Sequence, residues 1–417
     1  MKASNWDQKP LGTVADLCLG KMLDQKKNKG ELLPYLANLN VRWGGFSLDD
    51  LRTMRFESKE RDRYGLQFGD IVMCEGGEPG RCAIWKNQIP GMMIQKALHR
   101  IRPSKVLDYR FLHYSFLHIG QSKGFDQFFT GSTIKHLPLE KLAKVEVPVP
   151  PLPLQQRIAG ILSAYDDLIE NNTRRIKILE EMAQAIYREW FVNFRFHGRE
   201  RLTRGASPLG DTPRGWDVAT LAEVCIKGNG IQTGPFGSQL HESDYSDDGI
   251  PVVMPKDLID FRIRTNSIAR IPEETAERLS RHRMQTGDIV YGRRGDIGRR
   301  AFVMSHQTGW LCGTGCLRIR PNERAVNGWY LFNYLGEDDV VGLIKGRAQG
   351  VTMPNLNTAL LSSVPVKLPP RNLQDNFARL TFPMAEAREA LTAQNETLRR
   401  TRDLLLPKLI SGEITPS

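Results

Sequence analysis

The sequence of 417 residues has few cysteines and no long apolar run. Six cysteines are too sparse and too irregularly spaced for a disulfide framework in so long a chain. Only Cys312 and Cys316 lie close together, and a zinc site would need a second pair or suitably spaced histidines. Nowhere do about 18 apolar residues run together, and the initial "MKASNWDQKP" has no apolar segment of the secretory type. These absences predict a cytoplasmic protein with free thiols, no metal site and no membrane contact.

Signatures of bond chemistry are also missing. The sequence has no G-x-x-x-x-G-K-[ST] phosphate loop, no H-E-x-x-H, no G-x-S-x-G and no Asn-Pro-Pro-aromatic run of the kind that adenine methyltransferases use. The triplet "ESK" at residues 57–59 could be half of a nuclease signature, but no Pro-Asp precedes it. The spacing of His99, His113, His118 and His136 favours surface or capping roles. We therefore expect a non-catalytic chain without a cofactor of its own.

Positive charge is the main compositional bias, and it is unevenly placed. The net charge of +11 indicates a polyanionic partner, unless the charge serves solubility alone. Residues 1–147 carry +7 and residues 201–368 carry +3, whereas residues 148–200 are neutral and residues 369–417 carry +1. Most of the excess charge therefore lies on two large segments that a neutral segment separates.

The chain repeats itself at an offset of about half its length. "NWDQKPLGTV" matches "GWDVATLAEV" at an offset of 210, and "GDIVMCEGGEPGRCA" matches "GDIVYGRRGDIGRRA" at 218. "GSTIKHL" matches "GVTMPNL" at 219, and the same offset carries Gln155 onto Gln374. Between these anchors the two copies hardly resemble each other. The chain is thus a tandem duplication, with two similar scaffolds that carry different contact surfaces.

Each copy is predicted to be a mixed α+β domain. The turn-and-strand pattern "GDIV" occurs in both copies, and the pairs Gly77 with Gly80 and Gly295 with Gly298 follow it as loop positions that need positive φ. The runs "YRFLHYSFLHIG" and "NGWYLFNYLG" predict matching short apolar helices that end at glycine.

A long helix is expected after the first copy, from Gln155 to Phe194. At 1.5 Å per residue it would be roughly 60 Å long. Its apolar positions recur at alternating spacings of four and three, which is typical of a coiled-coil seam. The seam consists of Ile158, Leu162, Tyr165, Ile169, Asn172, Ile176, Leu179, Ala183, Ile186 and Trp190.

The second copy supplies the expected partner helix, although its seam is poorer. Arg388, Asn395 and Arg402 interrupt the apolar repeat, and Pro383 would kink the helix or mark its effective start. In the first seam, Asn172 either sets the register or is solvated at a loose crossing. The residues that fall every seven positions are Phe377, Met384, Leu391, Leu398 and Leu405.

Two copies of a unit that consists of a globular domain followed by a helix can be related by pseudo-two-fold symmetry within one chain. The predicted fold is therefore α+β, with two globular mixed α/β domains separated and joined by two long antiparallel coiled-coil helices that act as a spacer. The expected segments are a first domain at 1–150, a central helix at 151–200, a second domain at 201–368 and a C-terminal helix at 369–417 that pairs with the central one.

The motifs resemble those of a known family. "PVPPLPLQQRIAGIL" and its echo "LPPRNLQDNFARL", with "GWDVATLAEV", "GDIVYGRRGDIGR" and "GSTIKHLPL", are similar to the conserved helical regions and target-recognition domains of type I restriction-modification specificity subunits. The resemblance covers nearly the whole chain and is weakest in the second long helix. It implies that each domain recognises one half of a split site in double-stranded DNA, as part of phage defence. Because the copies differ in content, we expect an asymmetric site rather than a palindrome.

The resemblance also implies partners. The paired helices would set the spacing of the half-sites and dock two modification (methyltransferase) subunits, and motor-nuclease restriction subunits would join a larger assembly. Those subunits, and not this chain, would bind S-adenosylmethionine, ATP and Mg²⁺.

Candidate DNA contacts are basic and polar residues of the two domains. Lys and Arg hold phosphates, Arg most often pairs with guanine, and Asn or Gln with adenine. The candidates are Lys21, Lys26, Lys27 and Lys29 in "KMLDQKKNKG"; Arg81, Arg293, Arg294 and Arg299 in the glycine loops; Ser132, Thr133, Lys135, Thr352 and Asn355 on the loop before each long helix; and Lys256, Lys345 and Arg347.

Three classes of protein remain open on the sequence alone. A non-catalytic DNA-recognition subunit accounts together for the duplication, the charge placement, the helices and the missing motifs. A nuclease or methyltransferase with an unrecognised site would be revealed by catalysis in the isolated chain. A coiled-coil scaffold, or a stand-alone DNA-binding protein without a methyltransferase partner, is the third class, and a salt-dependent shift of duplex DNA would exclude the scaffold.

Overall fold

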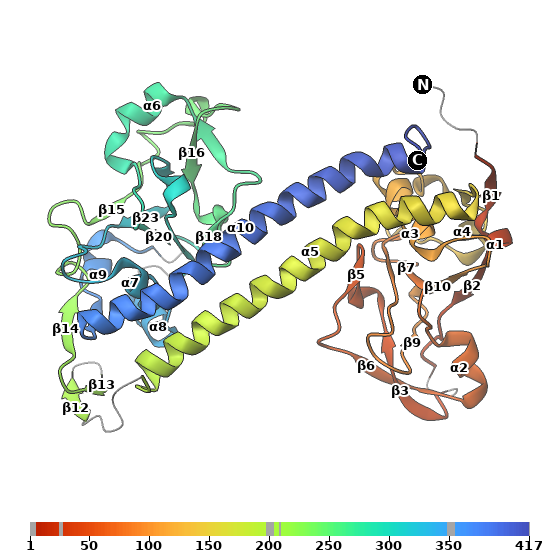
Figure 1. Cartoon of the computed structure of the whole chain (residues 1–417), viewed down its shortest axis with the longest axis horizontal. Helices are drawn as coiled ribbons and strands as arrows, with labels where there is room; N and C mark the ends of the chain where they lie inside the picture. The colour runs from red at the N-terminus through yellow and green to blue at the C-terminus, as the bar shows by residue number, and fades with distance from the viewer. Residues whose placement is uncertain (1–5, 25–27, 197–203, 208–209, 348–354, 417) are drawn as a thin grey trace. The chain divides into compact units, whose positions relative to one another are not determined.

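The chain folds into two compact units. Unit 1 is Met1–Arg174 with Leu391–Ser417, and unit 2 is Arg175–Ala390. Each unit contains one mixed α+β domain and a stretch of both long helices, α5 (Leu152–Tyr187) and α10 (Arg371–Ile410) (Figure 1). The computed structural model describes residues 6–24, 28–196, 204–207, 210–347 and 355–416.

A four-stranded antiparallel sheet in the order β2-β10-β7-β8 lies in unit 1, beside a three-stranded sheet in the order β6-β3-β9. Every residue of β7 is buried, as expected for a strand covered on both faces. The strands are β1 Gln8–Pro10, β2 Ala15–Leu19, β3 Glu31–Leu36, β4 Val41–Arg42, β5 Gly45–Phe46, β6 Arg52–Phe56, β7 Ile71–Cys74, β8 Cys82–Ile84, β9 Met93–Ile94, β10 Leu98–Pro103 and β11 Glu146–Pro148; the short helices are α1 Leu11–Val14, α2 Ser58–Tyr64, α3 Tyr109–Gln121 and α4 Leu139–Leu142.

Unit 2 repeats this plan, with a four-stranded sheet in the order β15-β23-β20-β21 and a three-stranded sheet in the order β19-β16-β22. The strands are β12 Arg204–Ser207, β13 Gly210–Pro213, β14 Asp217–Thr220, β15 Ile231–Thr233, β16 Ile250–Val253, β17 Leu258–Ile259, β18 Arg262–Ile263, β19 Ala269–Ile271, β20 Ile289–Gly292, β21 Arg300–Phe302, β22 Leu311–Cys312, β23 Cys316–Ile319 and β24 Pro365–Leu368; the short helices are α6 Glu273–Arg278, α7 Gly328–Tyr334, α8 Asp338–Arg347 and α9 Thr358–Ser362.

The duplication extends to the register of the strands. Leu98 of β10 lies opposite Cys74 of β7, and Cys316 of β23 lies opposite Gly292 of β20. Both positions are displaced by 218, the offset found in the sequence, and the other partners in these two ladders follow the same shift. A slip of one residue would turn every side chain of a strand to the opposite face. The identical register therefore shows that the two copies build the same scaffold.

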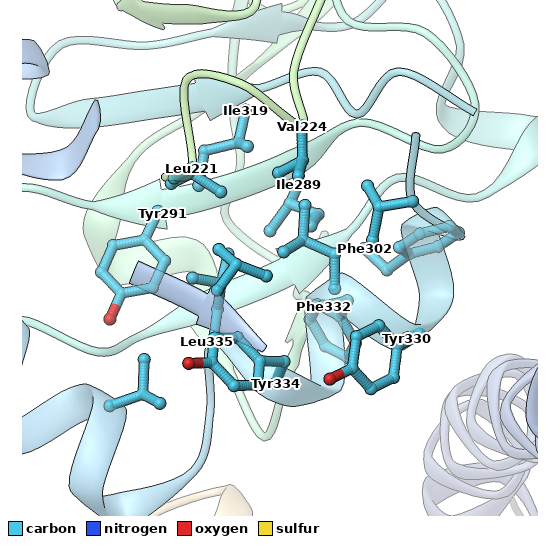
Figure 2. Close-up of a cluster of buried hydrophobic side chains, with 14 of the residues drawn as sticks. Leu221, Val224, Ile289, Tyr291, Phe302, Ile319, Tyr330, Phe332, Tyr334 and Leu335 are labelled. Atoms are coloured by element: carbon cyan, nitrogen blue, oxygen red, sulfur yellow. The ribbon is translucent and has the colours of Figure 1, made fainter. Parts of the chain in front are cut away.

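An aromatic core fills unit 2 between its sheet and α7. Tyr330, Phe332 and Tyr334 of α7 lie in one buried apolar cluster with Ile289 and other side chains of the sheet (Figure 2). The hydroxyl groups of Tyr330 and Tyr334 donate to backbone carbonyl oxygens of β24 at 2.8 and 2.9 Å. The buried tyrosines therefore satisfy their polar ends and join α7 to the strand that leads into α10.

A bidentate ion pair lies at the same place in both units. Nε and Nη2 of Arg320 donate to Asp288, both at 2.7 Å, and Nε and Nη2 of Arg102 donate to Asp70 at 2.7 and 2.8 Å. Each aspartate side chain is 1% exposed and also accepts the backbone N–H of the residue three positions before it. The Asp of "GDIV" thus fixes the turn that precedes the central strand in both copies.

A buried glutamine joins each long helix to its domain. The side-chain nitrogens of Gln155 and Gln374 each donate at 2.7 Å to the carbonyl of the proline five positions earlier. Their side-chain oxygens accept the backbone N–H groups of Asp108 and Asn327, at 2.8 and 2.9 Å. These two residues are the N-caps of α3 and α7. The glutamine therefore connects the first turn of the long helix to the first turn of the apolar helix.

The long helices begin and end differently from the sequence prediction. α5 begins at Leu152, and a π-helical turn, Arg188–Val192, follows it. α10 begins at Arg371 and continues through Pro383, so Pro383 does not mark the start of the helix. The proline ring removes one intrahelical hydrogen bond there without ending the helix.

Within each unit, stretches of α5 and α10 run antiparallel. The predicted seam residues are buried or half-buried in the structure. Ile158 and Leu162 share an apolar cluster with the end of α10 in unit 1, and Phe377 packs against Tyr187 in unit 2. The buried set is Ile158, Leu162, Ile169, Asn172, Phe377 and Leu391, and the half-buried set is Tyr165, Ile176, Leu179, Ala183, Ile186, Trp190, Met384, Leu398 and Leu405.

Polar residues in these seams find partners across the helices. Nδ2 of Asn172 donates to Oδ1 of Asn395 at 3.0 Å, and the two residues are 4% and 3% exposed. Arg402 pairs with Asp166 in the same unit. Asn172 is therefore not solvated at a loose crossing, and its buried amide pair favours one register of the two helices in unit 1.

We expect Asn172→Leu alone to lower the free energy of unfolding by about 1–3 kcal/mol, because the Asn395 amide would lose its best partner in a buried seam. The double variant Asn172→Leu/Asn395→Leu should regain most of that loss, since no amide is then left unpaired. Urea unfolding of the wild type, both single variants and the double variant gives the coupling energy. Strictly additive effects would argue against the amide pair.

Candidate nucleic-acid interface

One end of the four-stranded sheet in unit 1 carries three of the candidate loops. β2 and β7 both run antiparallel to β10, so their C-terminal ends lie at the same edge. Residues 20–24 continue from β2, and residues 75–81 join β7 to β8 as a hairpin. Residues 130–137 lie against this hairpin, since Gly76 and His136 form an antiparallel bridge.

The same edge of the sheet in unit 2 has the same construction. β15 and β20 both run antiparallel to β23, and residues 293–299 join β20 to β21 as a hairpin. Arg294 and Asn355 form the antiparallel bridge that corresponds to the one in unit 1. Each recognition edge, as we call this end of each sheet with its loops, therefore has the same backbone frame.

Glycine makes the hairpins possible. Gly77 and Gly80 have φ of 81° and 91°, and Gly295 and Gly298 have φ of 73° and 114°, which confirms the positive φ predicted from the sequence. A β-carbon at Gly80 would lie 2.9 Å from the ring of Phe125. The hairpins thus need glycine for backbone conformation, and at Gly80 for space as well.

Arg293 has an unusual environment on the second edge. It is only 8% exposed, its Nε donates to Oδ1 of Asn355 at 3.3 Å, and its guanidinium lies 6.0 Å from the ring of Phe236. Burial, followed by the charge of Arg294, lowers the pKa of Arg293 from its ordinary value. Among the residues that the structure describes, no carboxylate pairs with it. A desolvated cation without a counter-ion favours an approaching anion or acceptor.

Two of the other glycine-loop arginines, Arg81 and Arg299, are already paired, whereas Arg294 is exposed. Arg81 donates to Glu78 at 2.7 Å, and Arg299 donates to Asp296 at 2.9 Å. Each carboxylate comes three residues before its arginine, so the two pairs are equivalent and each connects two residues of the same hairpin. The carboxylates of these pairs are exposed, 52% for Glu78 and 58% for Asp296, so we expect the pairs to contribute little to stability.

Lys21 is a structural cation and not a surface one. It is 5% exposed, and its ammonium donates to the backbone carbonyl of Arg55 at 2.9 Å and to the Glu60 carboxylate at 2.6 Å. Its charge is therefore unavailable to a DNA phosphate, and we withdraw Lys21 from the predicted surface.

Among the remaining candidates, Ser132, Thr133, Lys135, Arg294 and Asn355 lie on the loops of the recognition edges. Lys345 lies 4.0 Å from the Asp296 carboxylate, and Arg347 donates to the carbonyl of Ser363 at 2.9 Å. Lys29, Ser132, Thr133, Lys135, Lys256 and Arg294 are exposed, and Asn355 is half-buried; Lys26, Lys27 and Thr352 lie outside the described residues.

Two of the four histidines for which we expected surface or capping roles are buried core residues instead. His99 is fully buried and its Nε2 lies 2.7 Å from the Leu137 carbonyl, while His113 lies 3.8 Å from the Cys82 sulfur. Burial lowers the pKa of His113 to about 4. Neutral imidazoles of this kind are core residues, which a single sequence cannot distinguish from surface histidines.

All six cysteines are buried and unpaired. In the described part of the chain, no group of three or more His, Cys, Asp or Glu side chains is placed to hold a metal ion. In the same part of the chain, no helix has the length and apolar character that crossing a membrane requires.

A duplicated α+β scaffold with two recognition edges and two long helices defines a two-domain nucleic-acid recognition protein. The family model for the type I restriction modification DNA specificity domain matches residues 3–181 and again residues 213–395. The chain belongs to this family.

Curated relatives span most of the chain. It is 26% identical over 349 residues to the MjaIX type I restriction enzyme specificity subunit of Methanocaldococcus jannaschii, covering 83% of this chain and 78% of that protein. It is 22% identical over 340 residues to the HindI specificity subunit of Haemophilus influenzae, covering 68% of this chain and 72% of that protein.

A solved structure shares the fold. The S subunit of a type I restriction-modification system from M. genitalium superimposes with a TM-score of 0.65 and 18% identity, over 100% of this chain and 98% of that one. At this identity the similarity shows a shared architecture and assigns no role to the residues of the recognition edges.

Proposed function

We propose that this chain is the DNA-recognition subunit of a type I restriction-modification complex, and that its two domains recognise the two halves of a bipartite, asymmetric site in double-stranded DNA. The proposal rests on one observation: the two domains share a backbone scaffold but carry different side chains on it. Register, glycine loops and loop bridges recur, whereas the residues on the two edges differ. A shared frame suits one mode of docking on duplex DNA, and different side chains suit two different half-sites.

Electrostatics supports DNA as the partner. The charges of +7 on residues 1–147 and +3 on residues 201–368 lie on the segments that contain the recognition edges. Cationic side chains such as Lys29, Lys135 and Arg294 are exposed there and can neutralise phosphates. In this proposal phosphate contacts fix the position of each domain, and side chains that face the groove discriminate bases.

We assign the chemistry to other subunits. In the proposed complex, two modification (methyltransferase) subunits dock on the α5–α10 helices, and restriction subunits complete the assembly. S-adenosylmethionine, ATP and Mg²⁺ then belong to those partners. The lack of an Asn-Pro-Pro-aromatic run and of a phosphate loop in the sequence supports a non-catalytic role for this chain.

Single-molecule sequencing of methylated adenines tests this function. Cells that express the chain with its modification partner should carry methylation at a two-part target with unlike halves and a fixed spacer. The partner expressed without this chain is the control and should leave those targets unmodified. A palindromic target would contradict asymmetric recognition, and methylation that does not depend on this chain would contradict its role as the recognition subunit.

A further inference from the structure

The hairpin of each recognition edge is joined to a second loop by the same backbone contact. In unit 1 the N–H of Leu137 donates to the carbonyl of Glu75 at 2.8 Å, and in unit 2 the N–H of Leu356 donates to the carbonyl of Arg293 at 2.9 Å. The carbonyl residues are 218 apart in sequence and the donor residues 219 apart, the offsets of the duplication. The two contacts are therefore equivalent positions of one scaffold.

The side chains at these positions differ in chemistry. In unit 1, Nδ1 of His136 lies 3.2 Å from the Glu75 carboxylate. In unit 2, Nε of Arg293 donates to Oδ1 of Asn355 at 3.3 Å. We call each of these two pairs of contacting side chains, Glu75 with His136 and Arg293 with Asn355, a cross-loop pair. One copy presents a carboxylate that accepts hydrogen bonds, and the other presents a guanidinium that donates them.

The side chains are not needed to join the loops. The backbone hydrogen bonds and the bridges Gly76–His136 and Arg294–Asn355 already do so in both units. The pair in unit 1 is also open to solvent, with the Glu75 side chain 21% and the His136 side chain 45% exposed. A rigid backbone with exchangeable polar side chains is the arrangement that base discrimination needs.

Resting on the proposed function, we propose that each cross-loop pair is a base-discriminating position, with Arg293 donating to O6 and N7 of a guanine in one half-site and Glu75 accepting from the N4 amino group of a cytosine in the other. These are the base-edge partners that the two side chains fit in the major groove. His136 and Asn355 act as positioning residues, because each makes a polar contact with the discriminating side chain while its own backbone is held by the bridge.

Arg293 is better suited to this role than Arg299 of the same hairpin. Its Nη atoms make no hydrogen bond or ion pair with the residues described, whereas Arg299 is bound to Asp296. The Phe236 ring and Asn355 limit the directions that the guanidinium can take. A donor that is oriented before DNA arrives loses little entropy when it binds.

The test replaces each discriminating side chain by glutamine in the complete complex and sequences the methylated sites. Arg293→Gln should change one base of one half-site, from guanine towards adenine, because Gln pairs with N6 and N7 of adenine. Glu75→Gln should relax one base of the other half-site, with its preference reduced about 10-fold or more. In each case the opposite half-site should stay as in the wild type.

Glu146→Gln is the matched control, because it is the same substitution at an exposed glutamate of β11 in the same unit, outside the loops of the recognition edge. It should leave the target unchanged. His136→Gln and Asn355→Ala provide a second measurement if either main variant fails to fold, and should relax the same base as Glu75→Gln and Arg293→Gln respectively.

Variants that lower methylation without changing any base of the target would overturn the proposal, as would changes spread over both half-sites. A wild-type complex that does not direct methylation to a bipartite site would instead overturn the proposed function, so the two failures are distinguishable.

Discussion

Asp288→Ala is expected to lower the free energy of unfolding of unit 2 by about 3 kcal/mol, because it would leave the Arg320 guanidinium, which is only 14% exposed, without its counter-ion. The carboxylate accepts two hydrogen bonds from Arg320 at 2.7 Å and one from the backbone N–H of Gln285 at 2.8 Å. After the substitution, Arg320 would keep only a 3.3 Å contact with the carbonyl of Arg283.

Amide hydrogen exchange of β20 and β23 measures this loss within unit 2, which avoids assuming that the two units unfold together. Asp296→Ala is the control, since its side chain is 58% exposed and its pair with Arg299 should contribute less than about 1 kcal/mol. Equal protection in wild type and Asp288→Ala would mean that the ion pair does not stabilise the sheet.

The second large effect is expected from Arg293→Ala/Arg294→Ala, which should weaken the affinity of the complex for its DNA site by roughly 100-fold or more at low salt. The double substitution removes Arg293, which in our proposal donates to a base, and Arg294, an exposed cation beside it. The slope of log affinity against log salt should become shallower by about one for each lost phosphate contact.

Fluorescence anisotropy of labelled duplex at several salt concentrations measures both quantities. Arg324→Ala serves as a charge control, because Arg324 is exposed in the same unit but lies outside the loops of the recognition edge. An affinity and a salt slope equal to those of the wild type would remove Arg293 and Arg294 from the interface.

The structural features that the sequence predicted correctly are those with local sequence patterns or with patterns that recur in both copies. The glycine loops were predicted from Gly-Asp turns and the spacing of glycines, and the offset of 218 predicted two similar scaffolds, which the shared strand register confirms. The seam of α5 was visible as a regular apolar period. Each of these features depends on residues that are close in sequence or on the comparison of one copy with the other.

Partners far apart in sequence were harder to foresee. Asn395 and Arg402 looked like defects of a single helix, although they pair with Asn172 and Asp166, more than 200 positions away. The burial of Lys21 depends in the same way on Glu60, on a helix that packs nearby only in the fold. A polar residue in a seam reveals its role only when the opposite helix is known.

The cross-loop pairs were partly missed for a different reason. Arg293 and Asn355 were predicted because their residue types are common at base edges, whereas Glu75 and His136 have types that a search for basic residues passes over. The signal was present in the duplication itself, because the same offsets place Glu75 at the position of Arg293 and His136 at that of Asn355.

The buried glutamines have a consequence for how the molecule moves. Gln155 links the start of α5 to the cap of α3, and Gln374 links the start of α10 to the cap of α7, each through a single amide between prolines and a capping residue. We expect this connection to be rigid, since the prolines restrict backbone rotation on one side and the cap does so on the other. A rotation of the first turn of α5 or α10 should therefore move the adjacent apolar helix, α3 or α7, together with it.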